Sequence, residues 1–246
     1  MNKHGILMCA RYAASPNFFG YCGPDKNSSL VDHIKDDIAD REVTHILSEF
    51  ETLYPYLRLI AEENKIEDFY DLRVVEAYWI GNSLLCSVKN IYYISFLKEL
   101  LQIEKRMSKQ TLSVVKSKLN KGKILPHHAF HVFNIFKKTA KDISFEAINT
   151  MDECRIGWGR VMRISKSDLT LYVETKPLEL INNKLRFGKI ILKKIQQDFN
   201  NIKLFNNLKK GDLTSFHWSN ICDKVTNLQV KNLEYYTQKA IDFYNE

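Results

Sequence analysis

The pattern of apolar residues changes once along the chain. In the first part, apolar side chains recur at intervals of three and four positions, which is the spacing of the buried face of a helix. Clear examples are Ile46, Phe50, Leu53, Leu57 and Ile60. Breaks that contain glycine or proline separate six or seven such segments. This pattern predicts a mostly α-helical domain over residues 1–150.

After about residue 152 the pattern becomes that of short strands. The segments are rich in β-branched and aromatic residues and are separated by polar turn sequences. They read RVMRI, LTLYVE, PLELI, KLRFGKIILKKI and LTSFHW. Five or six short strands in this length predict a small β-barrel.

A closing helix is predicted at the end of the chain. Thr226 and Gln229 have the spacing of a capping box. The inner face of this helix would carry Val230, Leu233, Ile241 and Tyr244. We therefore expect an α+β protein, with a helical domain over residues 1–150 and a barrel domain with a closing helix over residues 151–246, joined without a flexible linker.

Composition is that of an ordinary globular protein. The chain has 246 residues, of which 45% are hydrophobic, and no apolar stretch approaches the roughly 18 residues that a membrane span needs. The apolar run near the N-terminus is too short for a signal peptide, and no small-residue cleavage site follows it. We expect a cytoplasmic protein with no membrane partner.

The net charge of +7 does not change this expectation. The basic excess lies mainly in residues 151–246 and occurs as scattered pairs, such as Lys193-Lys194 and Lys209-Lys210. Scattered pairs are typical of a solvated surface, whereas a nucleic-acid site needs a basic patch or stripe on one face. Nucleic acid is therefore not the expected partner.

The cysteine pattern argues for reduced thiols. The five cysteines are Cys9, Cys22, Cys86, Cys154 and Cys222. Because their number is odd, their spacing is wide and no CxxC pair occurs, a disulfide framework is not expected. The chain also lacks the GxGxxG, GxxxxGK[ST] and GxSxG motifs of common nucleotide-binding and hydrolase sites. A thiol with a function here would bind a metal or react.

Cys154 lies where the helical pattern gives way to the strand pattern, and His217 ends a predicted strand. The first and last strands of a small closed barrel are commonly neighbours, so these residues could face each other. A thiolate and an imidazole together can bind a soft metal or act as a nucleophile and its base. The alternative interpretation is a small buried cysteine and a hydrogen-bonded core histidine.

The same two residues carry a resemblance to a known family. The segments MDECRIGWGRVMRI and GDLTSFHWSNICDKVTNLQVKNLEYYTQKAIDF resemble the hydrogenase assembly chaperone family, HypC/HupF. Cys154 and Gly159 match the cysteine and following glycine of that family, Gly211-Asp212 matches its turn, and His217 matches its histidine. The resemblance covers residues 151–246.

This resemblance implies a small OB-like barrel that carries iron on the way to [NiFe] hydrogenase. The iron would bear cyanide and carbon monoxide ligands, as in Fe(CN)2CO, and Cys154 and His217 would bind it. The implied partners are a maturation scaffold protein and the hydrogenase large subunit.

The whole chain also resembles an uncharacterised prokaryotic family with a GYCGPD motif. The shared segments are CARYAASPNFFGYCGPD (residues 9–25), VVEAYWIGN (residues 74–82) and HHAFHVF (residues 127–133). This second resemblance carries no assigned activity.

Two of these segments suggest a second site. Cys9 and Cys22 could form a thiolate pair or receive a metal, and Asp25 could join them or cap the next helix. On a helix, His127 and His131 would share a face at the spacing of two metal ligands. On a strand, His128 and Phe130 would share a face instead. The structural alternatives are a rigid turn before a helix and histidines that cap carbonyls or bond to carboxylates.

Three functions follow from these observations. The leading hypothesis is a cytoplasmic accessory protein for [NiFe] hydrogenase maturation, with Cys154 as thiolate and His217 as neutral imidazole on iron. The second is an enzyme of the same pathway, whose helical domain forms or attaches a ligand through Cys22 or the histidine cluster. The third is a single-stranded nucleic-acid-binding barrel, because OB-like folds often bind single strands.

Overall fold

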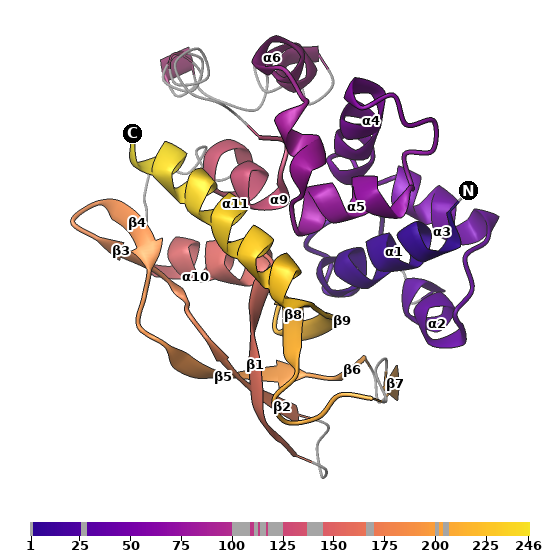
Figure 1. The fold of residues 1–246 in the computed structure, drawn as a ribbon, viewed down its shortest axis with the longest axis vertical. Coiled ribbons are helices and arrows are strands. Elements are labelled where there is room, and N and C mark those ends of the chain that lie inside the picture. Colours follow the sequence, from indigo (N-terminus) through magenta and orange to yellow (C-terminus); the bar gives the residue numbers. More distant parts are fainter. Residues whose placement is uncertain are drawn as a thin grey trace.

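The computed structural model describes residues 2–25, 29–99, 109–110, 113, 117, 125–136, 145–165, 170–199, 202–203 and 207–246. Helices precede a closed barrel along the chain, and a last helix follows it. Figure 1 shows the early helices on one side of the molecule and the strands on the other, with the last helix between them. The predicted α+β fold is therefore confirmed.

The N-terminal part is built around helix α1 (Lys3–Phe18), which contacts α2, α3 and α5. Most of α1 is buried on all sides, and Gly5 lets it approach the backbone carbonyl of Tyr70, where a Cβ atom would collide. Periodicity did not predict this helix, because a helix that is apolar all round has no polar face. The helices that follow are α2 (Ser29–Asp36), α3 (Arg41–Ser48), α4 (Leu53–Glu63), α5 (Leu72–Trp79), the 3-10 turn η1 (Ser83–Cys86) and α6 (Asn90–Glu99).

Two short helical elements and one longer helix lead to the barrel. They are α9 (His128–Phe130), the π-helical turn η2 (His131–Phe136) and α10 (Phe145–Cys154). The boundary predicted near residue 150 thus falls inside α10, whose last residue is Cys154.

The barrel has five strands, in the closed order β1-β2-β5-β9-β8. Neighbours are antiparallel, except that β5 and β9 run parallel. Their bounds are β1 (Gly157–Ile164), β2 (Thr170–Thr175), β5 (Ile191–Gln196), β8 (Leu213–His217) and β9 (Asn220–Lys224). The interior is filled by Val161, Leu171, Val173, Ile195, Phe216 and Ile221. A small closed barrel of five strands is the size expected for an OB-like domain.

One detail differs from the sequence prediction. The segments PLELI and KLRF form a separate hairpin of β3 (Leu178–Ile181) and β4 (Lys184–Phe187) outside the barrel, since Gly188 and the following residues separate them from β5. A second small hairpin pairs β6 (Asp198–Phe199) with β7 (Ile202–Lys203).

Helix α11 (Asn227–Asn245) joins the two halves. Its predicted capping box is confirmed, because Thr226 and Gln229 bond to each other's backbone N–H groups. The helix contacts α9, η2, β4 and β1. Near its middle, the Tyr236 ring packs where a Cβ atom of Gly81 would lie, and the Tyr236 hydroxyl donates to the carbonyl of Asn82 at 2.6 Å. One continuous apolar core therefore runs from the early helices to α11.

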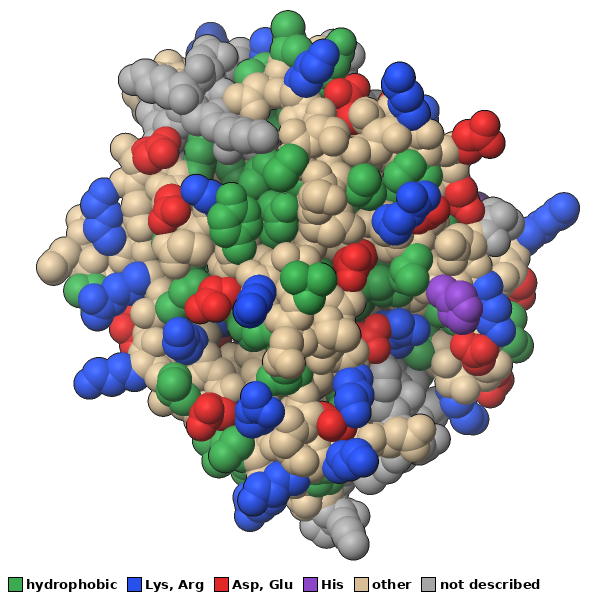
Figure 2. Space-filling model, in the orientation of Figure 1, with side chains coloured by type: hydrophobic (Ala, Val, Ile, Leu, Met, Phe, Trp, Pro, Cys, Tyr) green, Lys and Arg blue, Asp and Glu red, His purple; other side chains and the backbone are tan. Residues whose placement is uncertain are grey.

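The outer surface carries charges of both signs. Figure 2 shows lysine and arginine side chains interspersed with acidic ones over the visible face. None of the helices in the described residues combines the length and the apolar character that a membrane crossing needs.

Candidate metal centre

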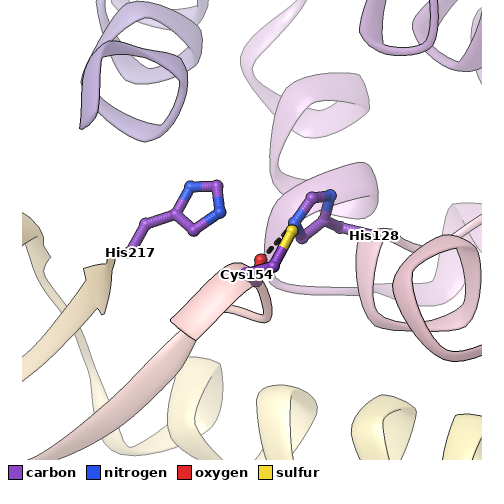
Figure 3. Close-up of side chains that lie close together, drawn as sticks. All are labelled: His128, Cys154 and His217. Carbon is purple, nitrogen blue, oxygen red and sulfur yellow. Dashed lines mark hydrogen bonds between the residues drawn. The ribbon is translucent and has the colours of Figure 1, made fainter. Parts of the chain in front are cut away.

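Three side chains, His128, Cys154 and His217, come together from three different elements. His128 begins α9, Cys154 ends α10 and His217 ends β8. One ligand atom of each residue lies within 4.8 Å of the others. Figure 3 shows the two imidazole rings turned toward each other, with the Cys154 sulfur beside His128. Among the described residues, this is the one group of three or more Cys, His, Asp or Glu side chains with the spacing of a metal site.

The ends of α10 and β8 are held together directly. The Trp218 N–H donates to the carbonyl of Glu153 at 2.9 Å, next to the two candidate ligands. The Glu153 carboxylate accepts from Lys193 at 2.6 Å and from the Ser219 hydroxyl at 2.8 Å. Trp218 and Ser219 both have positive φ, as a tight two-residue hairpin turn requires. These bonds fix Cys154 and His217 side by side.

His217 presents a free lone pair. Its Nδ1 lies 2.8 Å from the carbonyl of Tyr12, and because a carbonyl can only accept, Nδ1 carries the proton. Nε2 is then the lone-pair nitrogen. It is buried and makes no hydrogen bond of normal geometry among the described residues, although the backbone of Cys154 lies close enough to the ring to raise its pKa. Burial lowers the pKa of His217 to about 4, so the ring is neutral at pH 7. A neutral imidazole with its other nitrogen bonded to a carbonyl is the usual state of a metal-binding histidine.

His128 can adopt the same state with one rearrangement. Its Nε2 donates to the carbonyl of Cys154 at 2.8 Å, and its Nδ1 lies 3.2 Å from the Tyr78 hydroxyl. Burial, and then the neighbouring His217, lowers the pKa of His128 well below 6.5. A tyrosine hydroxyl can donate or accept. Tyr78 can therefore support either tautomer, including the one that frees Nε2 for a metal.

Aromatic rings enclose the cluster. The Trp79 ring lies 4.6 Å from that of His128 and 5.9 Å from that of His217, measured between centroids. The Tyr12 ring stacks on the Trp79 ring, with their centroids 5.6 Å apart. The segments 9–25, 74–82 and 127–133, which the sequence analysis singled out, thus meet at one place.

A cavity of about 580 Å³ opens beside the cluster. Its walls include His128, Cys154 and His217, together with apolar side chains from α1, α4 and η2 and aromatic side chains from α5. The candidate ligands therefore face an internal space.

A family model described as a family of unknown function, DUF6390, matches residues 1–246. The chain belongs to the DUF6390 family. No curated protein and no solved structure matches it.

The structure places the remaining predicted site residues of this DUF6390 chain apart from the cluster. Cys9 is fully buried in α1, and burial raises the pKa of its thiol to about 12. His127 is the N-cap of α9 and accepts from the Ala129 N–H at 3.3 Å. Asp25 is exposed at the end of its loop. Cys22 and His131 line the cavity but lie outside the group of three ligands.

The pair Cys154 and His217, predicted together from the sequence, is brought together in the DUF6390 structure. His128 joins this pair, although the sequence analysis assigned it to a second site. The roles of Tyr78 and of the Tyr12 carbonyl were not foreseen, because spacing does not reveal hydrogen-bond partners from distant segments. Their only signal was that Tyr12 and Tyr78 lie in segments 9–25 and 74–82, which the sequence already marked as candidates.

The donor set suits a soft or borderline transition metal. A thiolate and two imidazoles are ligands that zinc, iron and copper accept. With three protein ligands, a tetrahedral ion keeps one position open, as in metal sites that take a water or substrate. In the DUF6390 chain the cavity offers the space for that ligand.

Proposed function

We propose that this DUF6390 protein binds a transition-metal ion through His128, Cys154 and His217. We further propose that it serves as a cytoplasmic accessory protein of [NiFe] hydrogenase maturation, with iron as its cargo. The first statement rests on the geometry of the cluster, and the second adds the resemblance of residues 151–246 to the HypC/HupF family.

The observation that carries the metal site is the unpartnered Nε2 of His217. A buried polar atom without a hydrogen bond costs roughly 1–3 kcal/mol, and such atoms in native structures call for an explanation. One ring nitrogen of His217 lies within 4.8 Å of a ligand atom of Cys154 and one of His128. A bound metal would give Nε2 of His217 a partner.

Iron is favoured by the ligand set that the resemblance implies. A thiolate is soft enough to bind iron that carries cyanide and carbonyl ligands, and a neutral imidazole completes a site from which the ion can be transferred. The Fe(CN)2CO fragment would then pass between a maturation scaffold protein and the hydrogenase large subunit.

Anaerobic purification tests the proposal. The full chain is produced with iron and the maturation partners, and metal content and infrared spectra are recorded. We expect bound iron with cyanide and carbonyl bands, and loss of both in Cys154→Ala. His127→Asn is the matched control, since it changes the neighbouring buried histidine but keeps an N-capping side chain.

This experiment tests metal binding and the role in hydrogenase maturation independently. If the protein binds a metal but shows no cyanide or carbonyl bands, the proposed metal site is supported and the proposed hydrogenase cargo is contradicted. Metal content no higher than in the folded Cys154→Ala variant, for iron, zinc and cobalt alike, contradicts the metal site itself.

A second candidate is a metal-dependent enzyme, which the cavity favours. Cys22 and His131 line the cavity near the proposed ion without belonging to its ligands. If Cys22→Ser and His131→Ala abolish an activity while the metal stays bound, the cavity performs the chemistry.

A further inference from the structure

The cavity beside the proposed metal is larger than the metal requires. Its volume of about 580 Å³ lies within the roughly 300–1,000 Å³ of small-molecule sites. A single ion with water or two-atom ligands would fill only a small part of it. The remaining volume is large enough for a small organic molecule.

The walls of the cavity away from the ligands are largely apolar. Phe50, Leu53, Trp79 and Val132 line it and are all buried. Apolar walls with a few convergent polar groups are typical of sites that bind small organic molecules.

The mouth of the cavity is formed by a rigid loop. Tyr21 stacks on Trp218, with centroids 4.0 Å apart and rings 19° from parallel, which joins the loop to the barrel. The buried amide of Asn17 donates to the carbonyls of Cys22 and Pro24 at 3.1 and 2.8 Å. These contacts hold the cavity open in a fixed shape.

Gly23 allows the loop to lie close against the helices. It has a φ of +87°, and a Cβ atom there would come within 2.5 Å of the Phe50 ring. A glycine is therefore required for this wall.

The charges of the lining select against anions. Glu49 and Glu51 lie at the cavity, and none of the described residues that line it is a lysine or an arginine. A phosphate or carboxylate would have no basic side chain to pair with, so a neutral or cationic molecule fits best.

We propose that the cavity binds a small, neutral or cationic organic molecule with a ring, which coordinates the metal through one nitrogen, oxygen or sulfur atom. The donor atom takes the open position on the ion, and the ring lies against the apolar wall. This inference rests on the proposed metal site, but not on its role in hydrogenase maturation.

Cobalt reports on such a ligand. The full chain is loaded with Co(II), and the thiolate-to-cobalt and d–d absorption bands are followed during titration with imidazole and with 4-phenylimidazole. Both compounds coordinate through the same nitrogen, and they differ by one phenyl ring. We expect both to shift the bands, and 4-phenylimidazole to bind at least about tenfold more tightly because its ring is buried.

A variant that fills the cavity provides the next test. Thr52 lines the cavity and is partly exposed, so Thr52→Trp places a large side chain there with little risk to folding. We expect it to remove the preference for 4-phenylimidazole and to leave imidazole affinity unchanged. Thr44→Trp is the matched control, because Thr44 has similar exposure and does not line the cavity.

Alkylation of Cys22 gives a readout that does not depend on absorption bands. Cys22 and Cys86 are the exposed cysteines, and only Cys22 lines the cavity. Saturating 4-phenylimidazole should slow the alkylation of Cys22 at least about fivefold, as expected for a thiol covered by a bound ligand, and leave Cys86 unchanged.

The outcomes distinguish the two proposals. If cobalt binds with a thiolate band, but both compounds bind equally or neither shifts the spectrum, the organic-ligand site is overturned and the metal site stands. If no thiolate band forms with cobalt, the metal site fails and this inference fails with it.

Discussion

Two groups of thiols and imidazoles lie within the same core. Each contains one buried histidine nitrogen without a hydrogen-bond partner among the described residues, Nε2 of His127 and Nε2 of His217, and the groups differ in whether their side chains converge. In the first, Cys9 is enclosed in α1, while His127 and His131 bond to Ala129 and Tyr56. In the second, His128, Cys154 and His217 point toward one another, and the lone pair of His217 has no partner among the described residues. Burial shifts the pKa values of Cys9 and His127 in the first group and of His128 and His217 in the second. Burial alone therefore does not point to a metal site, and the convergence of three possible ligands is what distinguishes the second group as a candidate.

Loss of the Cys154 thiolate should weaken metal binding more than any other change considered. A structural zinc site contributes about 10–16 kcal/mol over four ligands, so one ligand is worth roughly 2.5–4 kcal/mol. We expect Cys154→Ala to weaken metal binding by roughly 60- to 700-fold, measured by competition with a chelator. Cys9→Ala, the control from the other group, should leave affinity unchanged and reduce stability by about 1 kcal/mol. Equal metal affinities for these two variants would remove the distinction between the groups.

The pH dependence of stability should be shared by both groups. Burial lowers the pKa of His217 to about 4 and that of His127 to about 3, from an ordinary value near 6.5. Below pH 6.5 the unfolded chain takes up protons that the folded protein does not, so the free energy of unfolding falls as the pH falls. At about 1.4 kcal/mol per pH unit, His217 alone accounts for roughly 3 kcal/mol between pH 6.5 and 4.

Urea unfolding of the metal-free protein at several pH values measures this loss. His217→Asn and His127→Asn should each make the dependence shallower, and only the first should also abolish metal binding. A stability that is constant between pH 6.5 and 4 would show that these rings are protonated in the folded protein.

Loss of the hydrogen bond between His128 and the Tyr78 hydroxyl should weaken metal binding less than loss of the Cys154 thiolate. Removal of a group that orients a metal-binding histidine typically costs 10–100-fold in affinity. We expect Tyr78→Phe to weaken metal binding by about tenfold or more, because the Nδ1 proton of His128 then has no acceptor. Tyr56→Phe is the matched control, since Tyr56 makes the corresponding bond to His131 at 3.1 Å. An affinity loss in Tyr56→Phe as large as in Tyr78→Phe would contradict the assignment of His128.

The sequence predicts the architecture well because periodicity is a local property. The helical segments, the closing helix with its capping box, and a small barrel were all expected. The separate hairpin of β3 and β4 was not, because strand pairing depends on distant segments. The pair of Cys154 and His217 was foreseen because each lies at the end of an element that borders the barrel.

The third candidate ligand, His128, could not be assigned from spacing. The rule for a regular helix pairs His127 with His131, but His127 is the N-cap, with extended φ and ψ of −111° and 146°. From His131 onward the chain forms a π-helical turn, which does not keep the 3.6-residue period. These two local features separate the side chains of His127 and His131 and leave His128 facing Cys154 and His217.

The smallest effect is expected at His127, and it tests the comparison most closely. His127 and His128 are adjacent, are both buried and both have a lowered pKa. In His127→Asn, the new side chain can still accept from the backbone at the start of α9, and the main loss is the stacking against Tyr236, worth about 1 kcal/mol.

We therefore expect this variant to bind metal within about twofold of the unmodified protein, whereas His128→Asn should lose affinity by about the amount assigned to one ligand. Chelator competition at pH 7 on both variants, with thermal unfolding to verify that each is folded, makes the measurement. If His127→Asn weakens metal binding as much as His128→Asn, the assignment of His128 and not His127 as the ligand is contradicted. The proposed metal site would then have to include other histidines of residues 127–133.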